Sequence, residues 1–387
     1  MKNLFRPGAG LPPPHLAGRE KAMRVLRTGQ TSINEGEGTN PIIVTGLRGM
    51  GKTVLVNRFR EELQPDAWLV PAVERFARNR GLASLWPRLM QAIEQIQPAD
   101  LVKRAGPKWT LENLDWKVGA EVGTSGVKGS GEIGGSLKRH LAPPVDDMID
   151  TLLSFAQKAD ELDIKVAFLL DEAHLAPPGD LAALAEVGQA CAERGLPMLV
   201  VLAGLRPLHD RLIKSREFAS RFPPLTAGLL SERDAEDALR IPVESQGGSW
   251  DRQALDAAIT FAQGIPFLVQ VIGKECVDGT DGDAISYRAA LDAVPRAQSS
   301  IAESMFRPLW RQASPAEQKY LIAMARGNRT LDGVAVSNIL KAMGKTSTDV
   351  APLRQRLIDK ALIHGTRYGN VDFSYPGFDA FVREETG

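Results

Sequence analysis

The chain has 387 residues, of which 43% are hydrophobic and 24% are charged. It therefore holds enough apolar side chains for a buried core, which excludes wholesale disorder. At roughly 150 residues per domain, this length predicts two or three domains. Lysine and arginine together number 47, as do aspartate and glutamate, so overall charge does not draw the chain to nucleic acid or to a membrane. Binding of either kind would need a local charged patch.

The two cysteines and the apolar runs indicate where the protein works. Cys191 and Cys276 are far apart and have no histidine or cysteine at ligand spacing, which argues against a disulfide framework and a zinc site. The longest apolar runs, 166–170 and 199–205, are far shorter than the roughly 20 residues of a membrane helix. No run near residue 1 has the pattern of a signal peptide. We therefore expect a soluble, cytoplasmic protein without membrane contact.

The predicted elements begin with a tail and a sheet domain. Residues 1–14 contain four prolines and two glycines, which predicts a flexible or extended tail. Over residues 15–228, short apolar runs alternate with helical patterns, which predicts an α/β fold of P-loop NTPase type, with a parallel sheet covered by helices on both faces. The expected strands are 41–44, 68–73, 165–170 and 197–203, and the expected helices are 19–28, 82–96, 145–162 and 181–194.

A glycine-rich stretch interrupts this alternation. Between Trp116 and Val122 every second residue is apolar, and the glycines within 123–126 could turn the chain into a second arm. The pattern predicts a hairpin inserted at about residues 106–137. A solvated decoration is the simpler interpretation. The functional alternative is a contact surface for a neighbouring subunit, a partner or DNA.

After residue 228 the strand patterns stop and helical patterns follow. Helices are expected over 232–239, 252–263 and 266–277, which together predict a helical lid over residues 229–307.

A phosphate-binding loop follows the first predicted strand. Gly46–Thr53 reads GLRGMGKT and fits the pattern G-x-x-x-x-G-K-[ST], with an apolar strand before it and an amphipathic helix after it. Its glycines would let backbone N–H groups surround an anion, which the positive end of the helix also attracts. Lys52 would contact the β and γ phosphates, and the Thr53 hydroxyl would bind Mg²⁺. A glycine-rich turn without function is the alternative, which the flanking elements disfavour.

An acidic pair follows a second buried strand. Asp171 and Glu172 come directly after 166–170, and ligands of such folds bind beyond the carboxyl ends of the strands. We expect this strand to neighbour the P-loop strand, with Asp171 holding Mg²⁺ and Glu172 acting as general base on the attacking water. Two solvated acids are the alternative. His174 completes the letters DEAH of one helicase group, but no second motor domain follows, so we interpret His174 as a loop histidine near the site.

With these motifs, the chain resembles the AAA+-like ATPases of the origin-recognition initiator group and the signal-transduction ATPases with numerous domains. The resemblance extends over nearly the whole chain and implies ATP as the nucleotide. His15–Glu20 (HLAGRE) is similar to the box that precedes the P-loop in these families, which implies that Leu16 and Arg19 line the adenine pocket. Gly264–Pro266 matches the G-x-P of the signal-transduction branch, which implies that Pro266 of the lid contacts the nucleotide.

Other family positions agree less well. Ser220–Phe222 is similar to the arginine-finger turn, so Arg221 would serve a neighbouring subunit in a nucleotide-dependent homo-oligomer; a surface arginine at a helix end is an equal alternative. The strand 197–203 resembles the sensor-1 strand, but Leu205–Arg206 stands where that family carries a polar residue near the strand end. In the lid, Phe267 follows the G-x-P, where the initiator branch places a sensor arginine.

The C-terminal residues 308–387 resemble a winged helix-turn-helix. Helices are expected over 315–325, 334–343 and 349–360, and short strands over 361–363 and 371–373. The third helix would take the recognition position on duplex DNA. Arg354, Arg356 and Lys360 on that helix and Arg367 in the wing are the candidate DNA contacts. Eleven basic against eight acidic side chains make the unit only mildly basic, so a protein partner is the alternative.

These patterns lead to one function and a rival. The leading hypothesis is a Mg²⁺-dependent ATPase switch that couples nucleotide state to DNA or partner binding. The rival is an ATP-gated scaffold that does not hydrolyse ATP and binds a protein partner. The expected ATP contacts are Leu16, Arg19, Gly46, Arg48, Gly49, Met50, Gly51, Lys52, Thr53, Val54 and Pro266; Glu172, Lys52 and Arg221 would be catalytic, and Thr53 and Asp171 would hold Mg²⁺.

Overall fold

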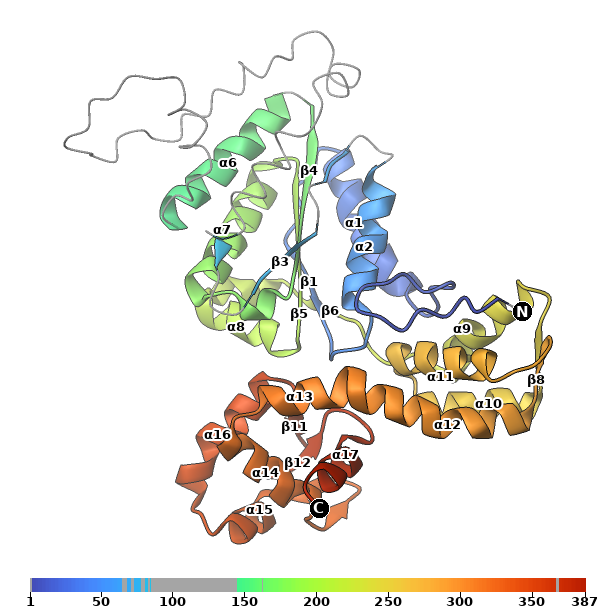
Figure 1. Ribbon diagram of the computed structural model, residues 1–387. Coiled ribbons are helices and arrows are strands. Elements are labelled where there is room, and N and C mark those ends of the chain that lie inside the picture. The colour runs from blue at the N-terminus through green and yellow to red at the C-terminus, as the bar shows by residue number, and fades with distance from the viewer. Residues whose placement is uncertain are drawn as a thin grey trace, which may run out of the picture.

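The structure is a computed structural model with a sheet domain, a helical lid and a C-terminal unit (Figure 1). The glycine-rich stretch 106–137, expected to be a hairpin, and most of the helix expected at 82–96 lie outside the described residues. No helix in the described part has both the length and the apolar character needed to cross a membrane. The described residues are 2–64, 68–70, 73–77, 81–82, 84, 145–161, 163–366 and 369–387.

A parallel sheet forms the centre of the first domain. Its strands lie in the order β2-β4-β5-β1-β6, and β3 also pairs with β4. The long central strands are runs of valine, leucine and alanine that are buried along almost their whole length, as strands covered on both faces require. The strands are β1 (Ile42–Thr45), β2 (Trp68–Leu69), β3 (Glu74–Arg75), β4 (Lys165–Asp171), β5 (Met198–Gly204) and β6 (Pro224–Thr226).

Helices cover both faces of this sheet (Figure 1). On one face α1 (Glu20–Asn34) and α2 (Lys52–Leu63) pack on a hydrophobic cluster. On the other face α6 (Val145–Glu161), α7 (Pro178–Arg194) and α8 (Pro207–Ser215) pack on a second cluster. The predicted α/β class is therefore confirmed.

The strand that carries the acidic pair is not next to the P-loop strand. β5 lies between them, with Val44 of β1 opposite Ala203 and Leu170 of β4 opposite Leu202. The expectation of neighbouring strands is wrong, because the order of strands along a chain does not determine their order in a sheet.

The lid consists of four helices, α9 (Glu232–Glu244), α10 (Arg252–Ala262), α11 (Pro266–Asp278) and α12 (Tyr287–Ile301). Two very short strands, β7 (Ser249–Trp250) and β8 (Ala284–Ile285), join its loops and were not predicted. From α12 the chain continues through one π-helical turn (Ala302–Phe306) into α13 (Arg307–Gln312). Residue 308, the expected start of the C-terminal unit, thus lies inside a continuous helical run.

The C-terminal unit has a four-stranded antiparallel sheet, in the order β11-β12-β10-β9, and four helices. This arrangement is compatible with a winged helix. The hairpin of β9 and β10 was not predicted, because two- and three-residue strands leave no periodic pattern, and Val334 and Ala335, expected to begin a helix, belong to β10. The last helix was not predicted either. The elements are α14 (Pro315–Ala325), β9 (Arg329–Thr330), β10 (Gly333–Ala335), α15 (Val336–Met343), α16 (Ser347–Asp359), β11 (Ile363–Gly365), β12 (Asn370–Phe373) and α17 (Phe378–Glu385).

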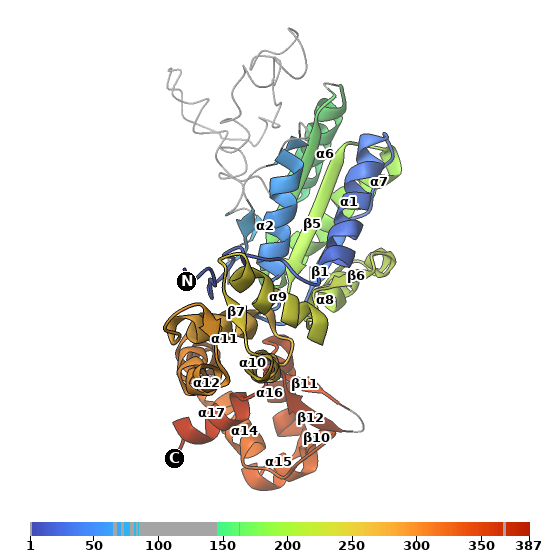
Figure 2. The same cartoon turned by 90° about the vertical axis from the view of Figure 1, so that its right-hand side faces the viewer.

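Residues 2–14 form neither helix nor strand, and Asn3, Phe5 and Arg6 contact the lid helix α11. Phe5 is buried against Gly273, where an added Cβ would lie 2.6 Å from the phenyl ring. The Asn3 side-chain amide donates to the Lys274 carbonyl, and the Arg6 N–H donates to Gln270 Oε1 at 3.2 Å. Figure 2 shows this segment between the sheet domain and the lid.

Candidate nucleotide site

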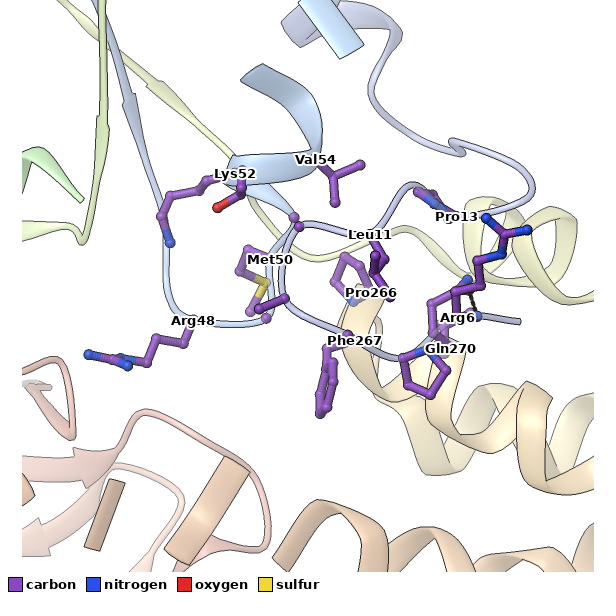
Figure 3. A pocket seen from close by; sticks show the side chains of 18 of the residues that line it. Arg6, Leu11, Pro13, Arg48, Met50, Lys52, Val54, Pro266, Phe267 and Gln270 are labelled. Atoms are coloured by element: carbon purple, nitrogen blue, oxygen red, sulfur yellow. Dashed lines mark hydrogen bonds between the residues drawn. The ribbon is translucent and has the colours of Figure 1, made fainter. Parts of the chain in front are cut away.

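A cavity of about 380 Å³ lies between the P-loop, the lid and the N-terminal segment (Figure 3). Its volume falls within the range of small-molecule sites. Most of the expected contacts line it, namely Leu16, Arg19, Arg48, Gly49, Met50, Gly51, Lys52, Thr53, Val54, Glu172 and Pro266. Residues that sequence reasoning did not anticipate also line it, among them Arg6, Gly10, Leu11, Pro13, Phe267 and Gln270.

The P-loop has the backbone that phosphate binding requires. Gly49 and Gly51 have φ values of 77° and 79°, in the left-handed region that favours glycine. Lys52 opens α2, and its Nζ donates to the Leu47 carbonyl at 2.8 Å. Burial lowers the pKa of Lys52 to about 8. Gly46 does not line the cavity; an added Cβ there would lie 2.5 Å from the Ala227 carbonyl oxygen, so glycine is needed for packing.

The helix that follows the P-loop contacts the acidic pair through a hydrogen bond between Thr53 and Asp171. The Thr53 hydroxyl donates to Asp171 Oδ2 at 2.6 Å, although β5 separates their strands. Asp171 is buried. A hydroxyl and a carboxylate are hard oxygen donors, which suit Mg²⁺ with nucleotide phosphates and water completing its shell.

Glu172 occupies a strained backbone position at the end of β4. Its φ of 54° is left-handed, which costs free energy for a side chain other than glycine and is concentrated at functional sites. Burial raises the pKa of Glu172 and the charge of Asp171 raises it further, while Arg48 and Lys52 oppose the rise. A carboxylate with a raised pKa is a stronger base.

Comparison with known proteins agrees with this geometry. Residues 15–201 match the family model of the AAA ATPase domain. The chain carries an AAA+-like P-loop ATPase domain. Residues 303–382 match a domain of unknown function, DUF8462. No curated protein matches the chain.

Two solved structures that match nearly the whole chain share its fold. The Walker-type ATPase PABY2304 of Pyrococcus abyssi has a TM-score of 0.64 and 17% identity, covering 96% of this chain and 98% of that one. The ORC2 protein of Aeropyrum pernix, solved as ADPNP–ADP complexes, has a TM-score of 0.56 and 14% identity, covering 99% of both chains. At these identities the likeness shows the fold, and the resemblance to origin-recognition ATPases is confirmed at that level.

Arg19 of the AAA+ domain lines the cavity, but its guanidinium already donates hydrogen bonds to backbone carbonyls of the protein. The residue is only 7% exposed and donates to the carbonyls of Gly18, Met50 and Gly228 at 3.1, 3.1 and 2.8 Å. Arg19 therefore connects the P-loop to the entrance of the lid.

Arg221 lies outside the site of its own AAA+ domain. It is exposed at the end of a short 3₁₀ helix (Glu217–Arg221), just before β6, and does not line the cavity. Its role as an arginine finger for another copy stays a prediction.

The described candidate DNA contacts, Arg354, Arg356 and Lys360, are all at least partly exposed, and two of them bind a buried carboxylate. Arg356 Nε donates to Glu317 Oε1 at 3.1 Å, and Lys360 Nζ donates to the same carboxylate and to the Gln312 carbonyl. Arg354 is partly exposed, and Arg367 lies outside the described residues. Two of the four basic side chains thus already have partners within the unit.

The C-terminal unit contacts the P-loop of the AAA+ domain directly, which sequence reasoning missed. The Arg48 N–H donates to the Tyr375 hydroxyl at 3.1 Å, and the Arg48 guanidinium donates to Gln312 Oε1 at 3.2 Å. Tyr375 is 1% exposed, and burial raises its pKa to about 12, so the hydroxyl is neutral. A lone tyrosine 327 residues from the P-loop carries no sequence signal of this contact.

Proposed function

We propose that this protein is a Mg²⁺-dependent ATPase switch in which the nucleotide controls how the C-terminal unit docks on the AAA+ domain, and that this unit binds duplex DNA or a protein partner. The hydrogen bond from the Arg48 N–H to the Tyr375 hydroxyl carries the proposal. Backbone N–H groups of a P-loop are the groups that bind phosphates. A bound phosphate would therefore compete with Tyr375, and ATP would weaken the docking.

Hydrolysis would use the residues around the cavity. Thr53 and Asp171 would hold Mg²⁺, which neutralises charge on the phosphates when it is bound. The Lys52 ammonium would contact the phosphates, and Glu172 would accept the proton of the attacking water. Arg221 of a neighbouring copy would add positive charge at the transition state.

The rival function is an ATP-gated scaffold without hydrolysis, and one observation favours it. β5 ends at Gly204, and the following Leu205 is buried and apolar, so neither residue offers a polar side chain to a γ phosphate. ATP would then act only as a ligand that stabilises one arrangement of the domains.

Steady-state ATP turnover of the full chain tests the proposal, with and without Mg²⁺ and duplex DNA. We expect slow, Mg²⁺-dependent turnover that Glu172→Gln reduces by about 10²-fold or more, as for loss of a general base, while ATP binding is retained. Stimulation by DNA would support DNA as the partner, whereas Mg²⁺-dependent turnover that DNA leaves unchanged would favour a protein.

The same measurement can also exclude ATP hydrolysis. Tight ATP binding with turnover no faster than that of the Glu172→Gln variant would exclude hydrolysis and leave the scaffold function.

A further inference from the structure

We propose that His174, in the turn after β4, is a positioning residue for Glu172. This inference rests on the proposed ATP hydrolysis. His174 would act through the carboxylate and not on the nucleotide, because it does not line the cavity.

His174 is buried beside the expected general base. It lies in the short 3₁₀ helix Ala173–Leu175 that directly follows Glu172, and it is only 7% exposed. Its Nδ1 is 3.5 Å from Glu172 Oε2 and is buried without a hydrogen-bond partner in the described structure. Buried nitrogen atoms are nearly always bonded, so an unpaired one beside a reactive carboxylate points to a function.

The end of β5 is built to accept this histidine. A Cβ added at Gly204 would lie 3.0 Å from the His174 backbone nitrogen, 3.3 Å from its Cβ and 2.9 Å from a methyl group of Leu208. The space that a side chain at position 204 would enter is therefore filled by His174 and Leu208. A polar residue at this position and the buried histidine exclude each other.

The imidazole is neutral under ordinary conditions. Burial, together with the positive charges of Arg48, Lys52 and Arg211, lowers the pKa of His174 to about 3. A neutral imidazole has one N–H donor and one acceptor nitrogen. With the proton on Nδ1, the ring can donate to Glu172 without adding a charge to the site.

This contact would fix the direction of the base. One carboxylate oxygen of Glu172 would accept from Nδ1, which leaves the other oxygen for the attacking water. The separation of 3.5 Å must shorten by a few tenths of an ångström to become a hydrogen bond, and catalytic hydrogen bonds commonly tighten when substrate binds. Loss of the contact should therefore slow turnover and leave ATP binding unchanged.

Three substitutions of His174 in the full-length protein separate positioning from packing. In His174→Asn the amide nitrogen can take the place of Nδ1, in His174→Gln it can take only the place of Nε2, and His174→Leu fills the volume without a donor. We expect Leu and Gln to lower kcat by about 10–100-fold, the usual effect of losing a supporting hydrogen bond. Asn should retain most of the turnover.

Each variant is also measured for the Kd of ATP and for thermal unfolding. The Kd should stay within about 3-fold of the original protein, since only a transition-state contact is removed. If His174 only fills the core, the order reverses, with Leu active and the polar Asn impaired. If the His174→Leu variant does not fold, the His174→Gln variant still tests the proposal.

The two proposals fail in different ways. Turnover that is unchanged in His174→Leu and His174→Gln would overturn the role of His174 alone. Turnover of the unmodified protein that does not exceed that of Glu172→Gln would overturn the proposed hydrolysis and the role of His174 with it.

Discussion

Glu317 illustrates how single residues of this protein depend on distant partners. It is 1% exposed, and its carboxylate accepts from the Ser314 N–H at 2.7 Å, from Arg356 and from Lys360. Basic residues on an exposed helical pattern resemble DNA contacts when only the sequence is considered. Here Arg356 and Lys360 also compensate a buried charge, and removing one partner of such a group is costly.

Glu317→Gln should destabilise the C-terminal unit in a pH-dependent way. Burial alone would raise the pKa of Glu317, but hydrogen bonds from Lys360, the Ser314 N–H and Arg356 outweigh it and hold the pKa below its ordinary value. Because the pKa is lower in the folded state, the stabilisation is present above the unfolded-state pKa and is lost as pH falls through the folded-state value. We expect a loss of about 1–3 kcal/mol at pH 7.

Urea unfolding of the original protein and of the Glu317→Gln variant, at pH 7 and in acid, measures this effect. The difference in unfolding free energy between the two proteins should shrink as the pH falls, and the exposed Glu384→Gln should change little at either pH. A difference that is constant with pH would contradict the assigned ion pairs.

At the scale of elements, the N-terminal segment has a position in the fold that its composition does not predict. Its prolines and glycines predict a flexible or extended tail, and the described residues 2–14 form neither helix nor strand and turn at residues 8–10. Its place along α11 depends on Gly273, because only glycine leaves room there for the ring of Phe5. Since residues that follow Phe5 line the cavity, the segment and the lid helix together enclose the nucleotide site.

Gly273→Ala should therefore speed nucleotide release. The new Cβ would lie 2.6 Å from the Phe5 ring, so the ring and the segment must move away from α11. We expect the dissociation rate of a fluorescent ATP analogue to rise roughly tenfold in stopped-flow experiments, since changes in affinity act mainly through dissociation. Phe5→Ala should act in the same direction.

Gly179→Ala is the matched control, because this helical glycine has no atom within 4 Å of an added Cβ. Equal dissociation rates in the Gly273 and Gly179 variants would show that the segment does not retain the nucleotide.

At the scale of the whole molecule, one of the two hydrophobic clusters extends through all four described parts of the chain. A single buried cluster contains Phe5 of the N-terminal segment, Leu55 of the sheet domain, Leu268 of the lid and Phe378 of the C-terminal unit. Phe306 in the bridge between α12 and α13 packs on the ring of Phe378, with centroids 5.4 Å apart. Movement of the C-terminal unit would therefore have to break defined contacts, as a switch between two discrete states requires.

Tyr375→Phe should loosen the docking of the C-terminal unit on the nucleotide-free AAA+ domain. The substitution removes only the hydroxyl that accepts from the Arg48 N–H. We expect faster amide hydrogen exchange in peptides from the P-loop and α17, and a smaller further change when ATP is added, because ATP would break the same contact.

The control for this prediction is Tyr320→Phe. Tyr320 is equally buried in the same unit, but its hydroxyl has no hydrogen-bond partner in the described structure. Equal rates of amide hydrogen exchange in the two variants would show that the Tyr375 hydroxyl does not contribute to docking.

The local features of this protein follow from its sequence. The P-loop, the acidic pair and the long strands were predicted because each depends on neighbouring residues: glycine spacing, a continuous apolar run, or a charge at a strand end. The α/β class followed from the alternation of such elements. These signals need no knowledge of how distant segments meet.

Tertiary structure alone decided the rest. It placed β5 between the two site strands, brought Tyr375 to the P-loop, paired Glu317 with two expected DNA contacts and buried His174 beside Glu172. Each of these contacts, except that of His174, joins residues far apart in the sequence. Even His174 owes its burial to Gly204 on another strand, because the environment of a side chain is set by the segments that fold around it.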